Sequence, residues 1–339
     1  MKTKQYATPG PRRGGRAAGA GPASTARARP RPAVGVIGLG IMGSAMAANL
    51  VAAGFQVHGC DLRAAPVRKL RRAGGVGHAH IAGVAQACRY FILSLPSAAA
   101  LAAVARELAL HGRKGSVAAE LSTLPIEAKE QARAALEESG IVLLDCPVSG
   151  TGAQAAAGDL SVYASGDPKA IRRMAPVFKG FARERHDVGA FGQGMRMKLV
   201  ANLLVAIHNV STAEAMLLGT RMGLDAQAML RALGDGAGGS RMLQVRGPMM
   251  AGRAWRQATM KLDVWRKDMR LIGDELDRLS VPAPLFSAAG PVYRAALALG
   301  HGPHDTAAVY DVLERWAAPV QGPPPAGRRP AGAKKNISD

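Results

Sequence analysis

Cysteine, acidic residues, aromatic residues and long apolar runs are all scarce in this 339-residue sequence. The three cysteines, Cys60, Cys88 and Cys146, are widely spaced and form no CxxC pair, which argues against a disulfide framework or a zinc site. We find no apolar run that approaches the roughly 18–20 residues needed to span a bilayer. The sequence therefore predicts a soluble, cytoplasmic protein with no membrane partner, whose core is mainly aliphatic because aromatic residues make up only 4% of the chain.

The shortage of acid leaves a formal net charge of +20, and much of the excess lies at the two ends. Residues 1–32 contain eight Lys or Arg and no acid, and residues 320–339 contain four Lys or Arg and one acid. Both ends are rich in Gly, Pro and Ala, a composition that buries too little apolar surface to offset the entropy lost on ordering. We predict disordered basic tails at 1–32 and 320–339. The first also resembles a mitochondrial transit peptide, although its Pro and Gly oppose the amphipathic helix that such a peptide needs.

Between the tails, the pattern of apolar residues changes from alternating strands and helices to helices alone. A short apolar run at 33–37 predicts a buried strand, which a helix at 44–53 and a strand at 55–60 follow. Alternation of this kind is typical of a parallel sheet with helices on both faces. Further strands are predicted at 90–95, 117–121, 141–144 and 160–164, and helices at 195–222, 225–233, 259–279 and 285–299.

The glycine-rich segment GLGIMG at residues 38–43 connects the first predicted strand to the first helix. In that position the pattern GxGxxG is typical of a dinucleotide-binding turn. Gly38 permits the tight turn, Gly40 lets the backbone approach a pyrophosphate, and Gly43 lets the helix pack closely on the strand. The helix N-terminus faces the phosphates. We predict that Gly38, Gly40, Ile41, Met42 and Gly43 bind the cofactor.

Asp61 lies eighteen residues after Gly43, at the end of the second predicted strand. An acid at this position accepts hydrogen bonds from the adenosine ribose, and its charge repels a 2′-phosphate. NAD is therefore favoured over NADP. Arg63 and Arg68 leave NADP as an alternative, because a nearby arginine can accommodate the phosphate.

Together these signals predict an α/β protein in two parts. An N-terminal Rossmann dinucleotide-binding domain would occupy residues 33–192. An all-helical substrate and oligomerisation domain would occupy residues 193–319, joined to the first by a long interdomain helix.

Four ordered segments resemble the β-hydroxyacid dehydrogenase family, which includes 3-hydroxyisobutyrate dehydrogenase and tartronate semialdehyde reductase. They are GLGIMGSAMAANL at 38–50, DCPVSGTGAQAAAGDL at 145–160, GQGMRMKLVAN at 192–202 and RKDMRL at 266–271. The resemblance covers residues 33–318. It implies a catalytic Lys198 with Asn202, a substrate site that includes Ser122, Ser149, Gly150 and Thr151, and nicotinamide-side contacts from Leu95, Pro96, Thr123 and Lys267, with Asp268 beside the last. Two positions depart from the family, which usually has a second glycine at Thr151 and commonly has aspartate at Glu120.

The chemistry of the predicted catalytic pair agrees with this resemblance. Lys198 and Asn202 are four residues apart, so they lie on one face of the long helix. Oxidation of an alcohol needs a group that takes the hydroxyl proton, which a positioned lysine can do. Its ammonium form would also stabilise negative charge that develops on the oxygen. This scheme needs no metal, and the eight histidines form no HxxxH or HExxH pattern.

The resulting prediction is an NAD(P)-dependent dehydrogenase that acts on the CH–OH group of a small 3-hydroxy acid, as a homodimer or homotetramer. The close alternative is the reverse reaction, reduction of tartronate semialdehyde or another short-chain semialdehyde. The basic tails motivate an alternative of another class, a non-catalytic nucleic-acid-binding protein on a dehydrogenase fold. The basic residues are not interleaved with aromatics, so we expect no specific nucleic-acid partner.

Overall fold

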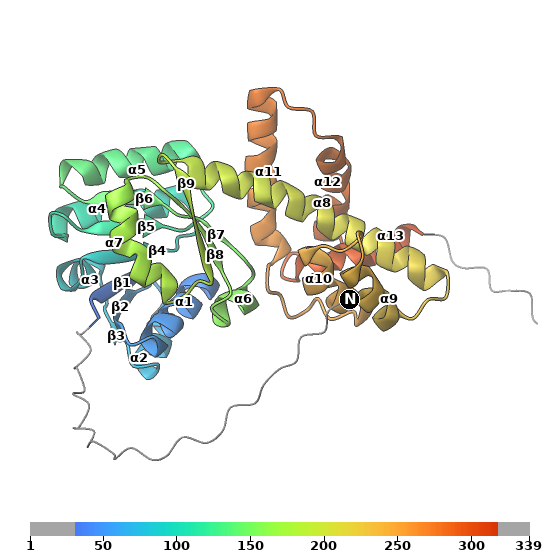
Figure 1. Cartoon of the computed structure of the whole chain (residues 1–339), viewed down its shortest axis with the longest axis horizontal. Helices are drawn as coiled ribbons and strands as arrows, with labels where there is room; N and C mark the ends of the chain where they lie inside the picture. Colours follow the sequence, from blue (N-terminus) through green and yellow to red (C-terminus); the bar gives the residue numbers. More distant parts are fainter. Residues whose placement is uncertain (1–30, 318–339) are drawn as a thin grey trace, which may run out of the picture. The chain divides into compact units, whose positions relative to one another are not determined.

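The computed structural model describes residues 31–317 (Figure 1). The predicted tails at 1–32 and 320–339 therefore lie almost entirely outside the described residues. The first element is the strand β1 (Ala33–Ile37), which matches the predicted first strand. Its residues from Val34 onward are buried.

The first half of the described chain is built around a nine-stranded sheet, which runs parallel over six strands in the order β3-β2-β1-β4-β5-β6. The strands following β1 are β2 (Gln56–Cys60), β3 (Val76–Gly77), β4 (Tyr90–Leu93), β5 (Val117–Glu120) and β6 (Val142–Asp145). Because parallel strands end at the same edge, the loops that follow β1, β2, β4, β5 and β6 meet there. A ligand of such a sheet binds at this carboxyl edge.

Beyond β6 the sheet changes direction. β8 (Ser161–Ser165) runs antiparallel to β6 and to the short β7 (Val148–Ser149), and β9 (Glu184–Gly189) pairs with β8 in parallel. The sequence predicts β8 but neither β7 nor β9. The expected parallel sheet therefore ends at β6.

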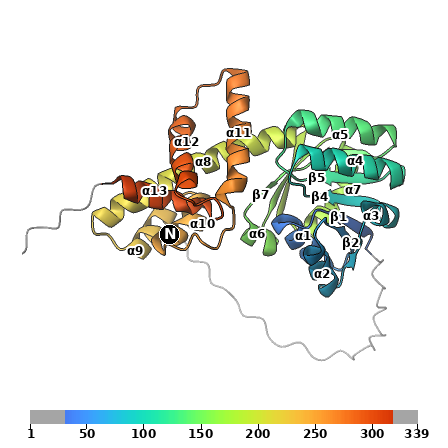
Figure 2. The ribbon, with the colours of Figure 1, turned by 180° about the vertical axis from the view of Figure 1, so that it is seen from behind.

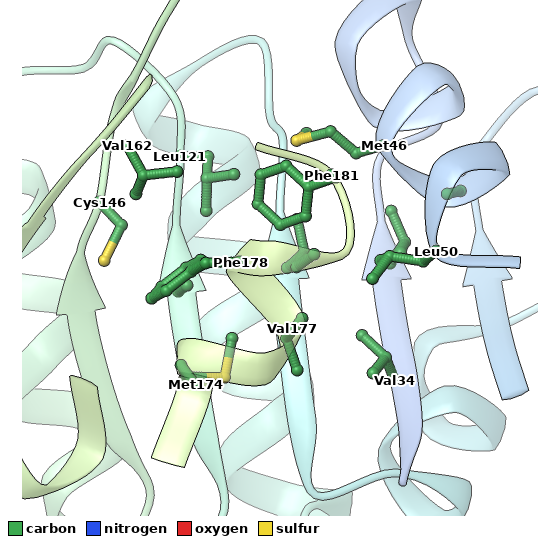
Figure 3. Close-up of a cluster of buried hydrophobic side chains, with 14 of the residues drawn as sticks. Val34, Met46, Leu50, Leu121, Cys146, Val162, Met174, Val177, Phe178 and Phe181 are labelled. Atoms are coloured by element: carbon green, nitrogen blue, oxygen red, sulfur yellow. The ribbon is translucent and has the colours of Figure 1, made fainter. Parts of the chain in front are cut away.

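Helices cover both faces of the sheet, as predicted. One face carries α1 (Ile41–Ala52), α2 (Ala64–Arg72) and α7 (Pro168–Lys179), and the other carries α3 (Ile81–Ala87), α4 (Ala98–His111) and α5 (Ile126–Glu138). Figure 2 shows the side with α3, α4 and α5. Successive residues of a strand belong to the cores on opposite faces of the sheet. Ile92 packs on the face with α1, α2 and α7, and Phe91 and Leu93 pack on the face with α3, α4 and α5. In Figure 3, Phe178 and Phe181 lie over the sheet, with Cys146 and Val162 on one side of them and Met46 and Leu50 of α1 on the other.

The second half of the described chain is helical throughout. Its central element is α8 (Gln193–Arg221), which contacts β8 and β9 near its start and five other α-helices along its length. The remaining helices are α9 (Ala226–Asp235), α10 (Arg241–Ala251), α11 (Leu262–Leu279), α12 (Pro284–Ala298), the 3₁₀ turn η1 (Thr306–Ala308) and α13 (Val309–Trp316). Trp265, Phe286 and Tyr293 belong to the buried core of this half. The predicted fold class, a Rossmann half followed by helices along one long helix, is confirmed.

By length and composition alone, α8 could cross a membrane. The sequence prediction concerned uninterrupted apolar runs, and α8 has none, because Lys198, Asn202 and Asn209 interrupt it. α8 meets the criterion because apolar residues occur around the whole helix, whereas a helix at the protein surface would have a polar face. The helix also buries Lys198, Asn202 and Asn209, and its contacts with strands and helices are those of a core helix.

Candidate active site

The turn between β1 and α1 requires glycine at two positions, Gly38 and Gly43. Gly38 has φ of +88°, and a Cβ there would lie 2.2 Å from the carbonyl oxygen of Ser94. A Cβ on Gly43 would lie 1.9 Å from the carbonyl oxygen of Gly38. A Cβ on Gly40 would meet nothing within 4 Å, so this residue faces open space. Gly40 is also the N-cap of α1 and offers no capping side chain, which leaves first-turn N–H groups of Ile41 and Met42 for a ligand. This cradle fits a dinucleotide pyrophosphate.

Asp61 follows β2 and is tied to the glycine turn. Its Oδ2 accepts a hydrogen bond from the Leu39 N–H at 2.8 Å, and its Oδ1 accepts from the backbone N–H and the Nε of Arg63 at 2.9 and 3.1 Å. Burial would raise the pKa of Asp61, but the hydrogen bonds from Arg63 and Leu39 outweigh it and hold the pKa below its usual value. The carboxylate is therefore charged at neutral pH, and it pairs with Arg63, one of the two arginines that could otherwise receive a 2′-phosphate.

The loops after β4 and β5 come together with α11 at the same edge. The Leu95 N–H donates to Ser122 Oγ at 2.7 Å, and Lys267 Nζ donates to the carbonyl oxygen of Thr123. Pro96 is exposed next to Leu95. Four residues that the sequence assigned to the nicotinamide side thus gather with Ser122, which was assigned to the substrate.

A cavity of about 440 Å³ lies where α8 meets the loop after β7. Five of the predicted residues line it, namely Lys198 and Asn202 from α8, Ser149 at the end of β7, and Gly150 and Thr151 from the loop that follows. Ser122 is not part of the lining within the described chain. Its hydroxyl instead accepts the Leu95 N–H, which positions the two loops relative to each other.

Thr151, which replaces the usual second glycine, stabilises the start of the next helix. It is the N-cap of the short helix α6 (Gly152–Ala156), where its Oγ1 accepts from the Gln154 N–H and its own N–H donates to the Gln154 side chain. This reciprocal arrangement is a capping box. The extra hydroxyl thus orders the helix that follows the loop.

Lys198 is buried in the cavity wall with 8% of its surface exposed. Burial is the main cause that lowers the pKa of Lys198 to about 8; the positive charge of Lys267 acts in the same direction, and the carboxylate of Asp268 opposes both. Asp268 also accepts from Asn202 Nδ2 at 3.0 Å and pairs with Lys267 Nζ at 2.9 Å. The amine is therefore close to the balance between its neutral and charged forms at neutral pH, as a proton-transfer group requires.

A second buried lysine, which the sequence did not single out, holds a charged network behind the site. Lys129 Nζ lies 2.7 Å from Glu120 Oε2 and 2.6 Å from Asp145 Oδ1, and all three side chains are fully buried. The two carboxylates outweigh the effect of burial and raise the pKa of Lys129. Lys129 could not be found from the sequence because it lies on α5, in none of the family segments.

This network reaches both the nicotinamide-side loops and the catalytic helix. Glu120 Oε1 accepts from the Ser122 N–H at 2.9 Å, while Asp145 Oδ2 accepts from the Met195 N–H in the first turn of α8 at 2.7 Å. The N-cap of α8 is Gly192, which has no side chain, so Asp145 supplies the missing cap from a distance. Lys198 follows Met195 by three residues and is oriented by the same turn.

No group of three or more His, Cys, Asp or Glu placed to hold a metal ion occurs within residues 31–317. The three cysteines are buried free thiols.

Comparison with known proteins decides the family. A model described as the NAD binding domain of 6-phosphogluconate dehydrogenase matches residues 33–213, and one described as NAD-binding of NADP-dependent 3-hydroxyisobutyrate dehydrogenase matches residues 192–313. L-threonate dehydrogenase of Cupriavidus necator is 33% identical over 284 residues, which cover 83% of this chain and 95% of that protein. The chain belongs to the β-hydroxyacid dehydrogenase family.

Other members of this β-hydroxyacid dehydrogenase family match over nearly their full length. NAD-dependent L-serine dehydrogenase of Pseudomonas aeruginosa is 30% identical over 85% of this chain and 99% of its own. A crystal structure of 3-hydroxyisobutyrate dehydrogenase from Salmonella typhimurium is 29% identical with a TM-score of 0.75, over 83% of this chain and 99% of its own. The predicted family, nicotinamide cofactor and enzyme class, an NAD(P)-dependent oxidoreductase of hydroxy acids, are confirmed, and the non-catalytic alternative is not favoured.

Proposed function

We propose that this protein oxidises the carbinol of a small 3-hydroxy acid with NAD, and that Lys198 Nζ accepts the hydroxyl proton. The observation that carries the proposal is a buried lysine with a pKa near 8 in a cavity that also contains the Ser149–Thr151 loop. In its neutral form the amine can take the proton as the alcohol is oxidised. In its charged form it stabilises the developing oxyanion and returns the proton in the reverse direction.

The other predicted residues take positioning roles in this scheme. Ser149, Gly150 and Thr151 would hold the substrate carboxylate, and Ser122 would order the adjoining loop. Asn202 is fixed through its Nδ2 by Asp268, which leaves its carbonyl oxygen for the substrate hydroxyl or for Lys198.

The dinucleotide would lie along the carboxyl edge of the sheet. Gly38, Gly40, Ile41, Met42 and Gly43 would cradle its pyrophosphate and Asp61 its adenosine ribose. Leu95, Pro96, Thr123 and Lys267 would border the nicotinamide. When bound, the cofactor supplies the hydride acceptor.

The same residues support reduction of tartronate semialdehyde or another short-chain semialdehyde, because Lys198 serves as acid in that direction.

An activity screen tests the proposed oxidation and this reverse reaction. Purified protein is assayed against 3-hydroxyisobutyrate, L-threonate, L-serine, glycerate and simple 2-hydroxy acids, each with NAD and with NADP. We expect turnover with at least one acid that has a 3-hydroxyl and no 2-hydroxyl, such as 3-hydroxyisobutyrate or L-serine, and little with acids that have a 2-hydroxyl alone. Turnover restricted to 2-hydroxy acids would overturn the proposal.

We expect kcat/KM to be higher with NAD than with NADP, and Asp61→Asn to narrow this preference roughly tenfold, the effect of losing one charge-assisted hydrogen bond. The substitution weakens the ribose contact, removes repulsion of the 2′-phosphate and frees Arg63 to bind it. The double variant Asp61→Asn/Arg63→Met is the matched control, because it should lose the gained NADP activity. Wild-type kcat/KM that is higher with NADP would show that Asp61 does not select the cofactor.

We further propose a cytoplasmic homodimer or homotetramer in which residues 33–192 bind the cofactor and residues 193–319 mediate assembly. Three buried free thiols fit a reducing compartment. Large apolar side chains exposed on the helical half fit an interface, and they include Leu204, Leu218, Val264, Val281 and Leu285. A small hydroxy acid is the expected partner, with no specific nucleic acid and no membrane.

A further inference from the structure

The wall of the cavity opposite the Ser149–Thr151 loop is fixed by a carboxylate that the proposed reaction does not use. Met260, from the residues between α10 and α11, and Arg246 of α10 both line the cavity. Both are bound to Asp305, which is fully buried behind this lining. We call residues 259 and 260 the 259–260 segment.

One oxygen of Asp305 holds the 259–260 segment. Asp305 Oδ2 accepts from the Thr259 N–H and from Thr259 Oγ1 at 2.8 Å each, and from the Met260 N–H at 2.9 Å. The carbonyl oxygen of Met260 accepts from the Thr306 N–H at 3.1 Å. Hydrogen bonds to an ionised acceptor are roughly twice as strong as neutral ones, so this carboxylate fixes both the backbone and the side chain of the segment.

The other oxygen of Asp305 holds Arg246. Asp305 Oδ1 accepts from Arg246 Nε at 3.2 Å and from the Ala307 N–H at 3.1 Å. Burial would raise the pKa of Asp305, but the charge of Arg246 and the hydrogen bonds outweigh it and hold the pKa below its usual value. Asp305 is therefore charged at neutral pH, and it serves as the counterion of Arg246.

The 259–260 segment in turn contacts the start of α6, directly after the Ser149–Thr151 loop. The carbonyl oxygen of Thr259 accepts from the Gly152 N–H at 3.4 Å. A Cβ on Gly152 would lie 2.7 Å from Cγ2 of Ile41 and 3.5 Å from that carbonyl oxygen. Gly152 thus lies between the cofactor turn and the 259–260 segment, so the position of the segment is passed on to the substrate loop.

We propose that Asp305 is a positioning residue for the reaction. It holds Met260 and Arg246 in the cavity wall and, through Thr259, the end of the Ser149–Thr151 loop, so that a bound hydroxy acid is oriented toward Lys198. The proposal rests on the proposed function. Asp305 acts only through the cavity wall, and a misplacement of reacting groups by about 1 Å can cost a factor of roughly 10² in rate.

Asp305→Asn tests this role directly. The variant keeps the size of the side chain but removes its charge and replaces one acceptor oxygen with an N–H donor, so either the 259–260 segment or Arg246 loses its acceptor. We expect kcat/KM for the best hydroxy acid of the screen to fall by roughly ten- to hundredfold, through a raised KM and a lowered kcat. The dissociation constant of NAD should change little.

Two further variants separate positioning from stability, with all assays run well below the Tm of each protein. Thr259→Val keeps the side-chain shape and the backbone contacts but removes the hydroxyl donor to Asp305, and it should raise the KM for the hydroxy acid severalfold. Asp311→Asn is the matched control. Asp311 pairs with His301 and Arg315 in the same part of the chain, outside the described lining of the cavity, so this variant should lower Tm and leave the KM unchanged.

Each failure has its own signature. Wild-type kinetics in folded Asp305→Asn, or in Thr259→Val if Asp305→Asn does not fold, would overturn the positioning role and leave the proposed function standing. A loss of NAD affinity as large as the loss of kcat/KM, or an equal loss of kcat/KM in Asp311→Asn, would also overturn it, because a general loosening of the fold would then explain the result. Absence of turnover by the wild-type enzyme with every acid of the screen would overturn the proposed function itself.

Discussion

Replacing Lys198 with alanine is expected to lower kcat by ~10²–10⁴, the usual contribution of a positioned proton-transfer group. The variant loses the only amine among the five predicted residues that line the cavity, so the hydroxyl proton must leave to water. NAD affinity should change little, because the cradle at Gly38–Gly43 and the carboxylate of Asp61 lie on the sheet half of the molecule. Steady-state kinetics on the best substrate of the screen, with calorimetric titration of NAD, measures both quantities.

Two further variants separate proton transfer from positioning. Lys198→Arg keeps the charge but should rescue poorly, because a guanidinium stays protonated and cannot accept the alcohol proton. Asn202→Ala should give a smaller loss of kcat with a raised KM, since its side chain orients rather than reacts. A near-wild-type kcat in folded Lys198→Ala would make this lysine a structural residue.

Lys129→Met is expected to destabilise the protein by ~3–5 kcal/mol, the usual cost of removing one partner of a buried ion pair. Glu120 and Asp145 would be left fully buried with no counterion. For a chain of this size that corresponds to a fall in Tm of roughly 5–8 °C. Thermal unfolding followed by circular dichroism provides the measurement.

The pH dependence gives this loss a second signature. Without Lys129, one of the two carboxyl groups should keep its proton when folded, so its folded pKa lies above its unfolded value. The raised pKa of that carboxyl group then adds to the free energy of unfolding at low pH, and this contribution is lost as the pH rises. The fall in Tm of Lys129→Met relative to the wild-type protein should therefore be larger at pH 8 than at pH 5.

Arg278→Met is the matched control for Lys129. It breaks an exposed pair with Glu275 on α11, and exposed pairs contribute less than about 1 kcal/mol. Equal and small changes of Tm in the two variants would show that the buried network does not stabilise the fold.

Much of the fold follows from local patterns in the sequence. The strands at β1, β2, β4, β5, β6 and β8 are short apolar runs, and α8 is a long helical pattern, so their positions could be predicted to within a few residues. β9 could not be predicted, because its sequence ERHDVG is largely polar and it pairs with β8 at the exposed end of the sheet. β3 and β7 have two residues each, too few for any periodicity.

The active site also has features that could be predicted from the sequence and features that could not. The glycine turn and the Lys198–Asn202 spacing are local, and the structure brings Lys198 and Asn202 to one cavity with Ser149, Gly150 and Thr151. Contacts made only by folding could not be predicted. Lys129 meets Asp145 from sixteen residues away, and Arg241 meets Asp159 from eighty-two, so neither pairing leaves a signal in the local sequence.

The pH dependence of kcat/KM, measured in both reaction directions, tests most directly whether Lys198 carries the proton. Oxidation needs the neutral amine, so its kcat/KM should fall about tenfold per pH unit below a pKa near 8 and level off above it. Reduction needs the ammonium form, so its kcat/KM should be level below that pKa and fall above it. Two opposite profiles that cross near the same pH are the predicted result. Profiles that are flat through this range, or that bend in the same direction, would contradict a proton held by Lys198.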